Sequence, residues 1–424
     1  MNRRQFLKKT VAASALLGSL GSFRIAHAGE SPNQKLLVGV MGCNGRGMDH
    51  IRGFLTQPNV EIAYICDVDE RAMARGIVEA EKKQGRKPQG VRDFRNILDD
   101  RSVDILAIAA PNHWHAPATI LACAAGKHVY VEKPASHNAH EAELIAVAAR
   151  KSNRIVQMGN QRRSWPAIRE AVSKLHTGVI GRLTAARCWY ANARGSIGRG
   201  KPSALPAWLD WSLWQGPATE RPFLDNVVHY NWHWRWHWGG GELANNGIHA
   251  LDLARWGLQV DYPRRVSCIG GRYHFEDDQE TPDTAVAAFD FGHCTATWEG
   301  SSCLLRKDES LPFVEFYGDK GSLSSDGTGY KIFDPNGKPV EEDKGSGGDA
   351  VHMGNFVDSI RNSGKPNSDI ADCAKSDLLC HLGNIAYRTG QTLAVDQKTG
   401  RILGNKTAEK LWKREYRKGW EPKV

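Results

Sequence analysis

The sequence predicts an α/β protein in which a doubly wound parallel sheet is followed by an α+β domain with a large, mostly antiparallel sheet. Continuous apolar runs alternate with helical patterns from residue 35 to residue 158, as in βαβ units whose strands are buried on both faces. A glycine-rich turn follows the first of these runs. Beyond residue 159, many apolar runs follow one another without intervening helices.

The first domain is expected over residues 35–158 and contains five predicted strands. Each is a short apolar run, and the segments between them carry apolar residues at helical spacing. A parallel sheet with helices on both faces is typical of a Rossmann domain. The predicted strands are 36–41, 60–66, 104–110, 128–131 and 155–158, and two of the predicted helices are 117–125 and 139–151.

The second domain is expected over residues 159–424. The sequence Asp-Pro-Asn-Gly at 334–337 predicts a hairpin turn between two of its strands. Two helical patterns, 351–361 and 370–389, close the chain and are able to pack back on the first domain. Further predicted strands are 183–190, 266–273, 285–291, 296–299 and 313–317.

The charge of the chain is concentrated at its N-terminus. The 424 residues carry 56 Lys and Arg against 47 Asp and Glu, a formal net charge of +9. Five of the basic residues and none of the acidic ones lie in residues 1–28, so the remainder carries only about +4. Because the sequence has no basic stripe interleaved with aromatic residues, we expect no nucleic-acid partner.

Residues 1–28 have the features of a targeting segment. A twin-arginine pattern at 2–8 precedes a weakly apolar stretch at 11–23 and a small-residue cleavage site at 26–28. The apolar stretch is too short, and too rich in Gly, Ser and Ala, for a membrane-spanning helix. We therefore expect export by the twin-arginine machinery, to the periplasm or beyond.

Nine cysteines are scattered singly along the chain, with no Cys-x-x-Cys pair. Their odd number and the apolar surroundings of several of them argue against a disulfide framework and against a zinc ribbon. Unpaired cysteines suit a protein that folds in the reducing cytoplasm and is exported already folded.

The turn at residues 41–47, MGCNGRG, lies between the first predicted strand and a helix. Glycines in such a turn permit positive φ and let backbone N–H groups approach a pyrophosphate at a helix N-terminus. Asp67 ends the second strand twenty residues after Gly47, where it can bind both ribose hydroxyls and repel a 2′-phosphate. The pattern predicts a site that favours NAD over NADP. Its turn residues are Gly42, Asn44, Gly45, Arg46 and Gly47.

Two further segments follow predicted strands. PNHWH at 111–115 follows the third strand, and EKP at 132–134 follows the fourth. Open α/β sheets bind ligands at the carboxyl ends of their strands. A lysine placed there can hydrogen-bond a substrate hydroxyl and ease the loss of its proton. The candidate binding residues are Pro111, Asn112, His115, Glu132 and Lys133.

Together with the glycine turn and Asp67, these segments resemble the glucose–fructose oxidoreductase/inositol dehydrogenase family, also written Gfo/Idh/MocA. The resemblance runs from about residue 35 to the C-terminus and is most specific in the first domain. It implies a nicotinamide dinucleotide, and a second domain that supplies the substrate floor and a dimer surface. Lys133 matches the family's Glu-Lys-Pro lysine, which lies beside the nicotinamide and the reacting carbon.

The segment 247–252, GIHALD, matches the family's Gly-x-His-x-x-Asp helix, so the resemblance makes His249 the catalytic histidine. Many members place an aspartate four residues earlier, where this chain has Asn245. Because asparagine hydrogen-bonds but takes no proton, the resemblance assigns proton transfer to His249 with the help of Lys133. Some glycoside hydrolases share the fold and bind NAD but lack this lysine, so Lys133 favours the dehydrogenase branch.

The segment 230–238, YNWHWRWHW, is unusually aromatic. An extended chain would place its four tryptophans on one face. A helix would align His229, His233 and His237 at metal-ligand spacing, but no carboxylate pattern accompanies them and we expect no metal. Buried tryptophans that pack one domain on another are one interpretation, and a platform on which a sugar ring stacks is the other. In the sugar-platform interpretation, the residues that contact the substrate are Trp232, His233, Arg235 and His237.

The sequence thus predicts an NAD-dependent enzyme that moves a hydride between a ring carbon of a sugar or sugar-like polyol and the nicotinamide. A redox-assisted glycoside hydrolase of the same fold, and a non-catalytic exported sugar-binding protein, remain alternatives. Since the periplasm has no supply of NAD, an exported enzyme must hold its nucleotide tightly and recycle it in place. We also expect a homo-oligomer.

Overall fold

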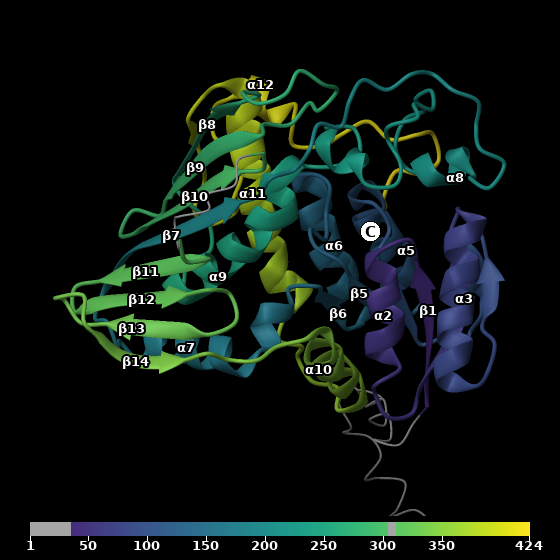
Figure 1. Ribbon diagram of the computed structural model, residues 1–424, viewed down its shortest axis with the longest axis horizontal. Coiled ribbons are helices and arrows are strands. Elements are labelled where there is room, and N and C mark those ends of the chain that lie inside the picture. Colours follow the sequence, from purple (N-terminus) through teal and green to yellow (C-terminus); the bar gives the residue numbers. More distant parts are fainter. Residues whose placement is uncertain (1–34, 304–310) are drawn as a thin grey trace, which may run out of the picture.

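The computed structural model describes residues 35–303 and 311–424, arranged around two sheets (Figure 1). The predicted targeting segment, residues 1–28, lies outside the described residues. Within them, no helix is long and apolar enough to cross a membrane. All nine cysteines lie in the described part, and each is a buried free thiol.

The first sheet has six parallel strands in the order β3-β2-β1-β4-β5-β6, which confirms the predicted doubly wound domain. The strand order changes direction between β1 and β4, the place where such sheets bind ligands beyond their carboxyl ends. The strands are β1 (Leu36–Met41), β2 (Val60–Cys66), β3 (Gln89–Val91), β4 (Ile105–Ile108), β5 (His128–Val131) and β6 (Val156–Met158).

Helices cover both faces of this sheet, as its apolar strands require. Side chains of α2 such as Ile51 and Phe54 pack on Val38 and Val40 of β1 in one core, and α5 and α6 belong to the core on the other face. The helices are α2 (Arg46–Phe54), α3 (Glu70–Gln84), α4 (Arg95–Asp99), α5 (Asn112–Ala124) and α6 (Ala139–Ser152).

Helix α5 begins at Asn112, five residues earlier than the predicted helix 117–125. Pro117 lies inside it, where a proline removes the hydrogen bond to the carbonyl four residues earlier. That carbonyl, His113 O, instead accepts a hydrogen bond from Nη2 of Arg414 at 2.9 Å. A contact from the far end of the chain therefore allows the helix to continue across the proline.

The second sheet has nine strands in the order β14-β13-β12-β11-β7-β10-β9-β8-β15. Only β7 and β10 pair in parallel, and the other pairs are antiparallel, as predicted. The turn at 334–337 joins β13 to β14, which confirms the predicted hairpin. The strands are β7 (Leu183–Ala191), β8 (Arg265–Gly271), β9 (Thr284–Asp290), β10 (Thr295–Ser301), β11 (Val314–Gly318), β12 (Gly321–Ser325), β13 (Tyr330–Phe333), β14 (Pro339–Asp343) and β15 (Leu393–Ala394).

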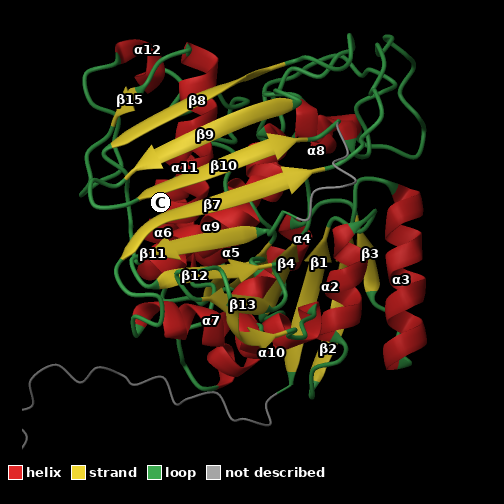
Figure 2. Cartoon of the chain, turned by 60° about the vertical axis from the view of Figure 1, so that its left-hand side comes forward, coloured by secondary structure: helices red, strands yellow, loops and turns green. Residues whose placement is uncertain are grey.

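Helices α7 (Pro166–His176), α9 (Ile248–Leu258) and α11 (Ile370–Thr389) lie against one face of this sheet, with α11 between it and the first domain (Figure 2). The long α11 contacts α9 and β8 on one side and α6 of the first domain on the other. The elements are η1 (Gln161–Ser164), α7 (Pro166–His176), α8 (Trp211–Gln215), η2 (Asn231–Trp234), η3 (Leu243–Gly247), α9 (Ile248–Leu258), α10 (Asp349–Arg361), α11 (Ile370–Thr389) and α12 (Lys406–Glu409).

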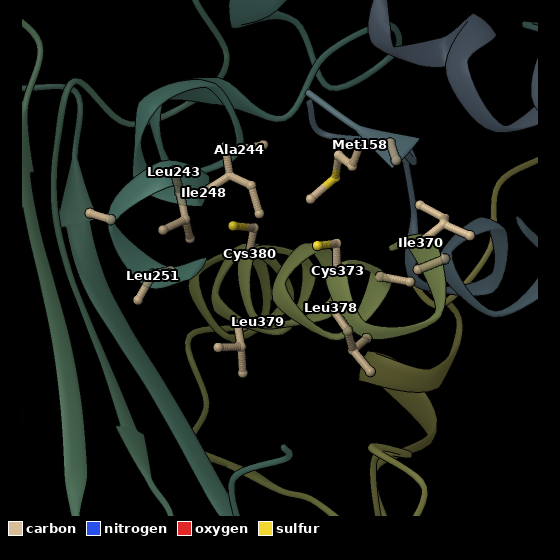
Figure 3. Packing of buried hydrophobic residues seen from close by; sticks show 14 of the residues in the cluster. Met158, Leu243, Ala244, Ile248, Leu251, Ile370, Cys373, Leu378, Leu379 and Cys380 are labelled. Atoms are coloured by element: carbon tan, nitrogen blue, oxygen red, sulfur yellow. The ribbon is translucent and has the colours of Figure 1, made fainter. Parts of the chain in front are cut away.

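The two terminal helices join the parts of the molecule. Met353 and Phe356 of α10 are buried in the same core as α2 and β1, so α10 completes one face of the first sheet. Cys373 and Cys380 of α11 lie in an apolar cluster with Met158 of β6 and residues of η3 and α9 (Figure 3). This shared core fixes the start of α9 relative to the carboxyl ends of the first sheet's strands.

Candidate active site

A cavity of about 360 Å³ lies at the carboxyl ends of the parallel strands, where the first sheet changes direction. Its walls come from the glycine turn, the ends of β2 and β5, and the start of α5. Asn245 and the aromatic segment close it from the second part of the chain. We call this cavity the nucleotide pocket.

The glycine turn has the close packing that its sequence predicts. Gly42 has φ +87°, and a Cβ there would stand 2.7 Å from the backbone nitrogen of Ala110, just after the neighbouring strand β4. Gly47 lies against the carbonyl oxygen of Gly42. By contrast, no atom lies within 4 Å of the place where a Cβ on Gly45 would stand, at the N-terminus of α2. The turn is therefore closed on its inner side and open towards the pocket.

Substituting Gly47 with alanine is expected to lower the melting temperature and to weaken nucleotide binding. The added Cβ meets the backbone of Gly42, which cannot move as a flexible side chain can. We expect a stability loss of about 1–3 kcal/mol, typical of overpacking. Thermal melting and titration with NAD measure the two effects. Gly195→Ala is the matched control, because no atom lies near a Cβ at Gly195; equal melting and NAD affinity of the two variants would contradict the packing argument.

Asp67 follows Cys66, the last residue of β2, and lines the pocket. Its carboxylate accepts hydrogen bonds from the backbone N–H of Cys43 at 2.6 Å and from that of Asp69 at 2.9 Å. Burial raises the pKa of Asp67, and these two hydrogen bonds oppose the rise. The carboxylate is thus held beside the glycine turn.

Lys133 and Asn245, from different parts of the chain, are in direct contact. Nζ of Lys133 donates to the backbone oxygen of Asn245 at 2.8 Å and to its side-chain oxygen at 3.2 Å. Residues Leu243–Gly247 form a π-helical turn before α9, and such turns, common at functional sites, disturb the usual pairing of helix carbonyls. Burial lowers the pKa of Lys133, although the charge of Glu132 opposes this.

Glu132, which precedes Lys133 in the sequence, belongs to a cluster of charged side chains in which its own carboxylate is buried. Its Oε1 accepts from Nε of Arg46 at 2.7 Å and lies 3.1 Å from Nε2 of His50. Burial would raise the pKa of this carboxyl, but Arg46 and His50 hold it well below its usual range. Arg46 also donates to Asp349 of α10. These contacts fix Glu132 as a carboxylate beside Lys133.

Residues of the segment 111–115 line the pocket and also hold the Glu-Lys-Pro turn in place. Pro111, Asn112 and His115 line the pocket. The ring of His115 lies between two carbonyl oxygens, 2.5 Å from that of Pro134 and 2.6 Å from that of Ala110. It therefore ties the end of β4 to the Glu-Lys-Pro turn and holds Lys133 in place.

His249 lies in the first turn of α9, half-buried, and outside the lining of the nucleotide pocket. Burial, together with the charges of Lys133 and Arg162, lowers the pKa of His249 well below its usual value. Its Nδ1 is buried without a hydrogen-bond partner among the described residues. The ring is therefore neutral, and it has a donor or acceptor available for a ligand that reaches it.

The aromatic segment is neither extended nor α-helical, so both conformations considered from the sequence are wrong. Residues Asn231–Trp234 form a 3₁₀ turn, and three of the four tryptophans are buried, with Trp236 half-buried. Within the described residues, no group of three or more His, Cys, Asp or Glu side chains is arranged to hold a metal ion.

The structure brings only two of the four proposed substrate residues to the pocket. Trp232 and His233 line it, with their rings stacked 3.5 Å apart between centroids. Arg235 is buried and donates to Asp278 at 2.9 Å, away from the pocket. His237 lines a different cavity. The sequence interpretation that placed Arg235 and His237 at this pocket is therefore wrong.

Several pocket residues were not predicted. Arg92 and Phe94 follow β3, which is too short to leave a clear sequence signal. Trp214 belongs to α8, in a region that the sequence leaves unassigned, and its carbonyl accepts from Nε1 of Trp114 at 3.0 Å, which holds α8 over the pocket. Tyr230 lies in the aromatic segment and could have been included with Trp232.

These residues fit a bound dinucleotide. The open N-terminus of α2 at Gly45 leaves room for a pyrophosphate, since helix N-termini favour anions. Asp67 lies at the adjoining edge, and Lys133 lies across the same cavity. The fold and this pocket define a two-domain, nucleotide-binding oxidoreductase.

Comparison with known protein families gives the same class of protein. Residues 36–160 match the NAD-binding Rossmann fold of an oxidoreductase family, and residues 180–422 match that family's C-terminal alpha/beta domain. The chain belongs to the Gfo/Idh/MocA family, which confirms the resemblance found in the sequence.

Individual relatives are more distant. A glycosyl hydrolase family 109 protein from Saccharopolyspora erythraea is 31% identical over 202 residues, which are 43% of this chain and 44% of that protein. Levoglucosan dehydrogenase from Pseudarthrobacter phenanthrenivorans is 26% identical over 227 residues, 53% of this chain and 51% of that enzyme. The chain thus spans about half the length of these curated relatives.

Solved structures share the fold over nearly the whole described chain. Aldose-aldose oxidoreductase from Caulobacter crescentus, complexed with glycerol, superposes with a TM-score of 0.66 at 19% identity, covering 85% of this chain and 100% of that one. A levoglucosan dehydrogenase in complex with NADH and levoglucosan has a TM-score of 0.67 at 18% identity, covering 86% and 100%. At this identity the likeness establishes the fold.

Proposed function

We propose that the protein is an NAD-dependent oxidoreductase that acts on a sugar or a sugar-derived polyol. The observation that carries the proposal is the contact of Lys133 with Asn245 inside the same pocket as the glycine turn and Asp67. Two relatives are consistent with it, since one is named levoglucosan dehydrogenase and another inositol 2-dehydrogenase. When bound, NAD supplies a carbon that accepts or returns a hydride.

The residues around this pocket can handle the proton of a substrate hydroxyl. Nζ of Lys133, with its lowered pKa, is suited to hydrogen-bond that hydroxyl and to take its proton. Asn245 orients Nζ through two oxygen atoms. The neutral ring of His249 provides the second proton-accepting group, and Glu132 maintains a negative charge beside the lysine.

The aromatic wall supports a carbohydrate substrate. Trp232 and His233 form a stacked pair at the pocket, and Tyr230 adds a hydroxyl. Flat rings beside polar atoms suit a sugar, whose C–H face is apolar and whose edge carries hydroxyls. Burial lowers the pKa of His233 to about 3, so this ring contacts the substrate as a neutral group.

A panel of free sugars, polyols and glycosides tests the reaction class. We expect a keto product from at least one sugar or polyol, detected by mass spectrometry. Release of an aglycone without net oxidation would instead identify the redox-assisted hydrolase, the reaction class suggested by the name of the family 109 relative. Binding without turnover would leave a sugar-binding protein and refute the enzymatic proposal.

Replacing Asp67 with alanine is expected to weaken NAD binding and to narrow the preference for NAD over NADP. The carboxylate provides both the ribose contact and the charge that repels a 2′-phosphate. Titration of apoprotein with each dinucleotide measures the change. Asp319→Ala, an exposed acid at the far edge of the molecule between β11 and β12, is the control. An unchanged ratio of the two affinities would remove Asp67 from the site.

We further propose that the protein is exported with its nucleotide bound. The twin-arginine pattern of residues 2–8 motivates the export. Export of a folded protein permits loading in the cytoplasm, and closure of the pocket by the aromatic segment favours slow release. A second substrate, or a redox-neutral reaction, then restores the nucleotide in place. Localisation of the full-length chain after osmotic shock, compared with an Arg3→Lys, Arg4→Lys double variant, tests this route; cytoplasmic retention of both would contradict it.

A further inference from the structure

A second cavity, of about 350 Å³, lies between the two parts of the chain and has no role in the proposed reaction. It is lined by the start of α6, the end of the aromatic segment, α11 and residues 411–415. The aromatic segment separates it from the nucleotide pocket, since Trp232 lines the first cavity and Trp236 the second. We call it the cationic cavity.

The charged side chains that line the cationic cavity are mostly basic. Among the described residues that line it, four are basic, and Glu415 is the single acid. Arg414 is partly compensated by Glu141 at 3.3 Å. Arg221 is 3.9 Å from Glu280, and Arg388 lies over the ring of Trp236. The four basic residues are Arg221, Arg388, Lys413 and Arg414.

The start of α6 lies beside the cavity. Asn138 caps the fourteen-residue helix, its side chain accepting from the backbone N–H of Glu141, and the buried Glu141 carboxylate accepts from the backbone N–H of His137 at 2.8 Å. Because this first turn already carries an acid, the excess positive charge of the cavity comes from its arginines and Lys413. Beside this turn, Nδ1 of His137 and Nη1 of Arg414 are buried without hydrogen-bond partners among the described residues. Burial and the charge of Arg414 lower the pKa of His137 well below its usual value, as expected in a positive environment.

Neutral polar groups complete the lining. Asn384 also lines the cavity, with its Nδ2 donating to the carbonyl oxygen of Gly240 at 2.8 Å and its side-chain oxygen left as an acceptor. Thr219 lines it as well, and Trp236 provides a half-buried indole. Guanidinium groups recognise carboxylates and phosphates with paired hydrogen bonds, and side-chain amides suit hydroxyl groups. The cavity therefore combines anion recognition with recognition of a small hydroxylated body.

We propose that the cationic cavity binds a small hydroxylated anion, such as a sugar acid or a sugar phosphate, with its charged group among Arg221, Arg388 and Arg414. This site is distinct from the nucleotide pocket. Because the aromatic segment contributes to both, a ligand here contacts the same segment that closes over the proposed reaction centre.

Isothermal titration of the whole protein with glucuronate, glucose 6-phosphate and neutral glucose tests the proposal. We expect at least one charged sugar to bind, and Arg388→Met to weaken that binding about tenfold or more, since a hydrogen bond to a charged group is worth about one to two factors of ten. Binding of glucuronate alone identifies a carboxylate, and binding of glucose 6-phosphate alone identifies a phosphate.

Two controls separate this cavity from other sites. Arg101→Met removes an exposed arginine near the opposite, amino-terminal edge of the first sheet, and Lys133→Met alters the nucleotide pocket. Both variants should bind the charged sugar as the unaltered protein does. If Arg388→Met fails to fold, Arg221→Met serves in its place. The proposal is overturned if no charged sugar binds, if the cavity variant binds as tightly as the parent, or if Lys133→Met abolishes binding.

Discussion

Replacing Lys133 with methionine is expected to lower kcat by about 10²–10⁴-fold, the usual contribution of one acid–base group, and to leave nucleotide binding nearly unchanged. Methionine keeps much of the lysine's length but cannot donate to Asn245 or take a proton from a substrate. The glycine turn and Asp67, which are assigned to the nucleotide, are not altered. Steady-state kinetics and a dinucleotide titration measure the two quantities separately.

The pH profile adds a second readout for Lys133. Burial lowers the lysine's pKa, so the rate of sugar oxidation should rise with pH and level off below the pH at which an exposed lysine titrates. Lys87→Met, a change at an exposed lysine, is the control and should retain both rate and profile. Full activity of Lys133→Met would exclude this lysine from the reaction.

Replacing Arg163 with methionine is expected to destabilise the protein by about 3–5 kcal/mol, the typical cost of leaving a buried charge unpaired. Arg163 is 4% exposed, and it donates to both oxygens of the buried Asp252 at 2.8 and 2.7 Å. It also donates to Asp372 of α11 at 2.6 Å. The pair joins η1 to α9, the helix that carries His249 and follows Asn245.

Chemical denaturation measures this loss of stability. Arg150→Met, an exposed arginine near the end of α6, is the matched control and should change the free energy of unfolding little. A loss below about 1 kcal/mol in Arg163→Met would indicate that Asp252 finds another partner or becomes protonated. In that case the ion pair between Arg163 and Asp252 would not contribute to the stability of the fold.

The first domain could be predicted because its physical signals are local. Strands buried on both faces must be apolar, and a turn that approaches a phosphate needs glycine, so β1, β2 and Gly42 are visible in the sequence. The place of α10 could be predicted only in part, since the sequence allows the helix 351–361 to pack back on the first domain without showing which face it covers. Its apolar residues, such as Phe356, indicate a buried face, but only the folded chain shows that α2 and β1 cover it.

The aromatic segment shows a second limit of sequence reasoning. Its alternating tryptophans and its histidine spacing each suggested a regular conformation. The observed 3₁₀ turn depends instead on tertiary contacts such as that of Arg235 with Asp278, which lies 43 residues later in the chain. The same contact removes Arg235 from the pocket. A pairing at that separation leaves no periodic signal.

The central claim is that the nucleotide pocket holds NAD and passes a hydride between it and a sugar. The most direct measurement is to purify the protein without added cofactor, release its nucleotide by denaturation before and after incubation with the sugar panel, and separate NAD from NADH chromatographically. We predict near-stoichiometric NAD(H), and a change in its redox state with at least one sugar for the unaltered protein but not for Lys133→Met. A protein that purifies empty, and that forms no NADH when NAD and the same sugars are added, would contradict the claim.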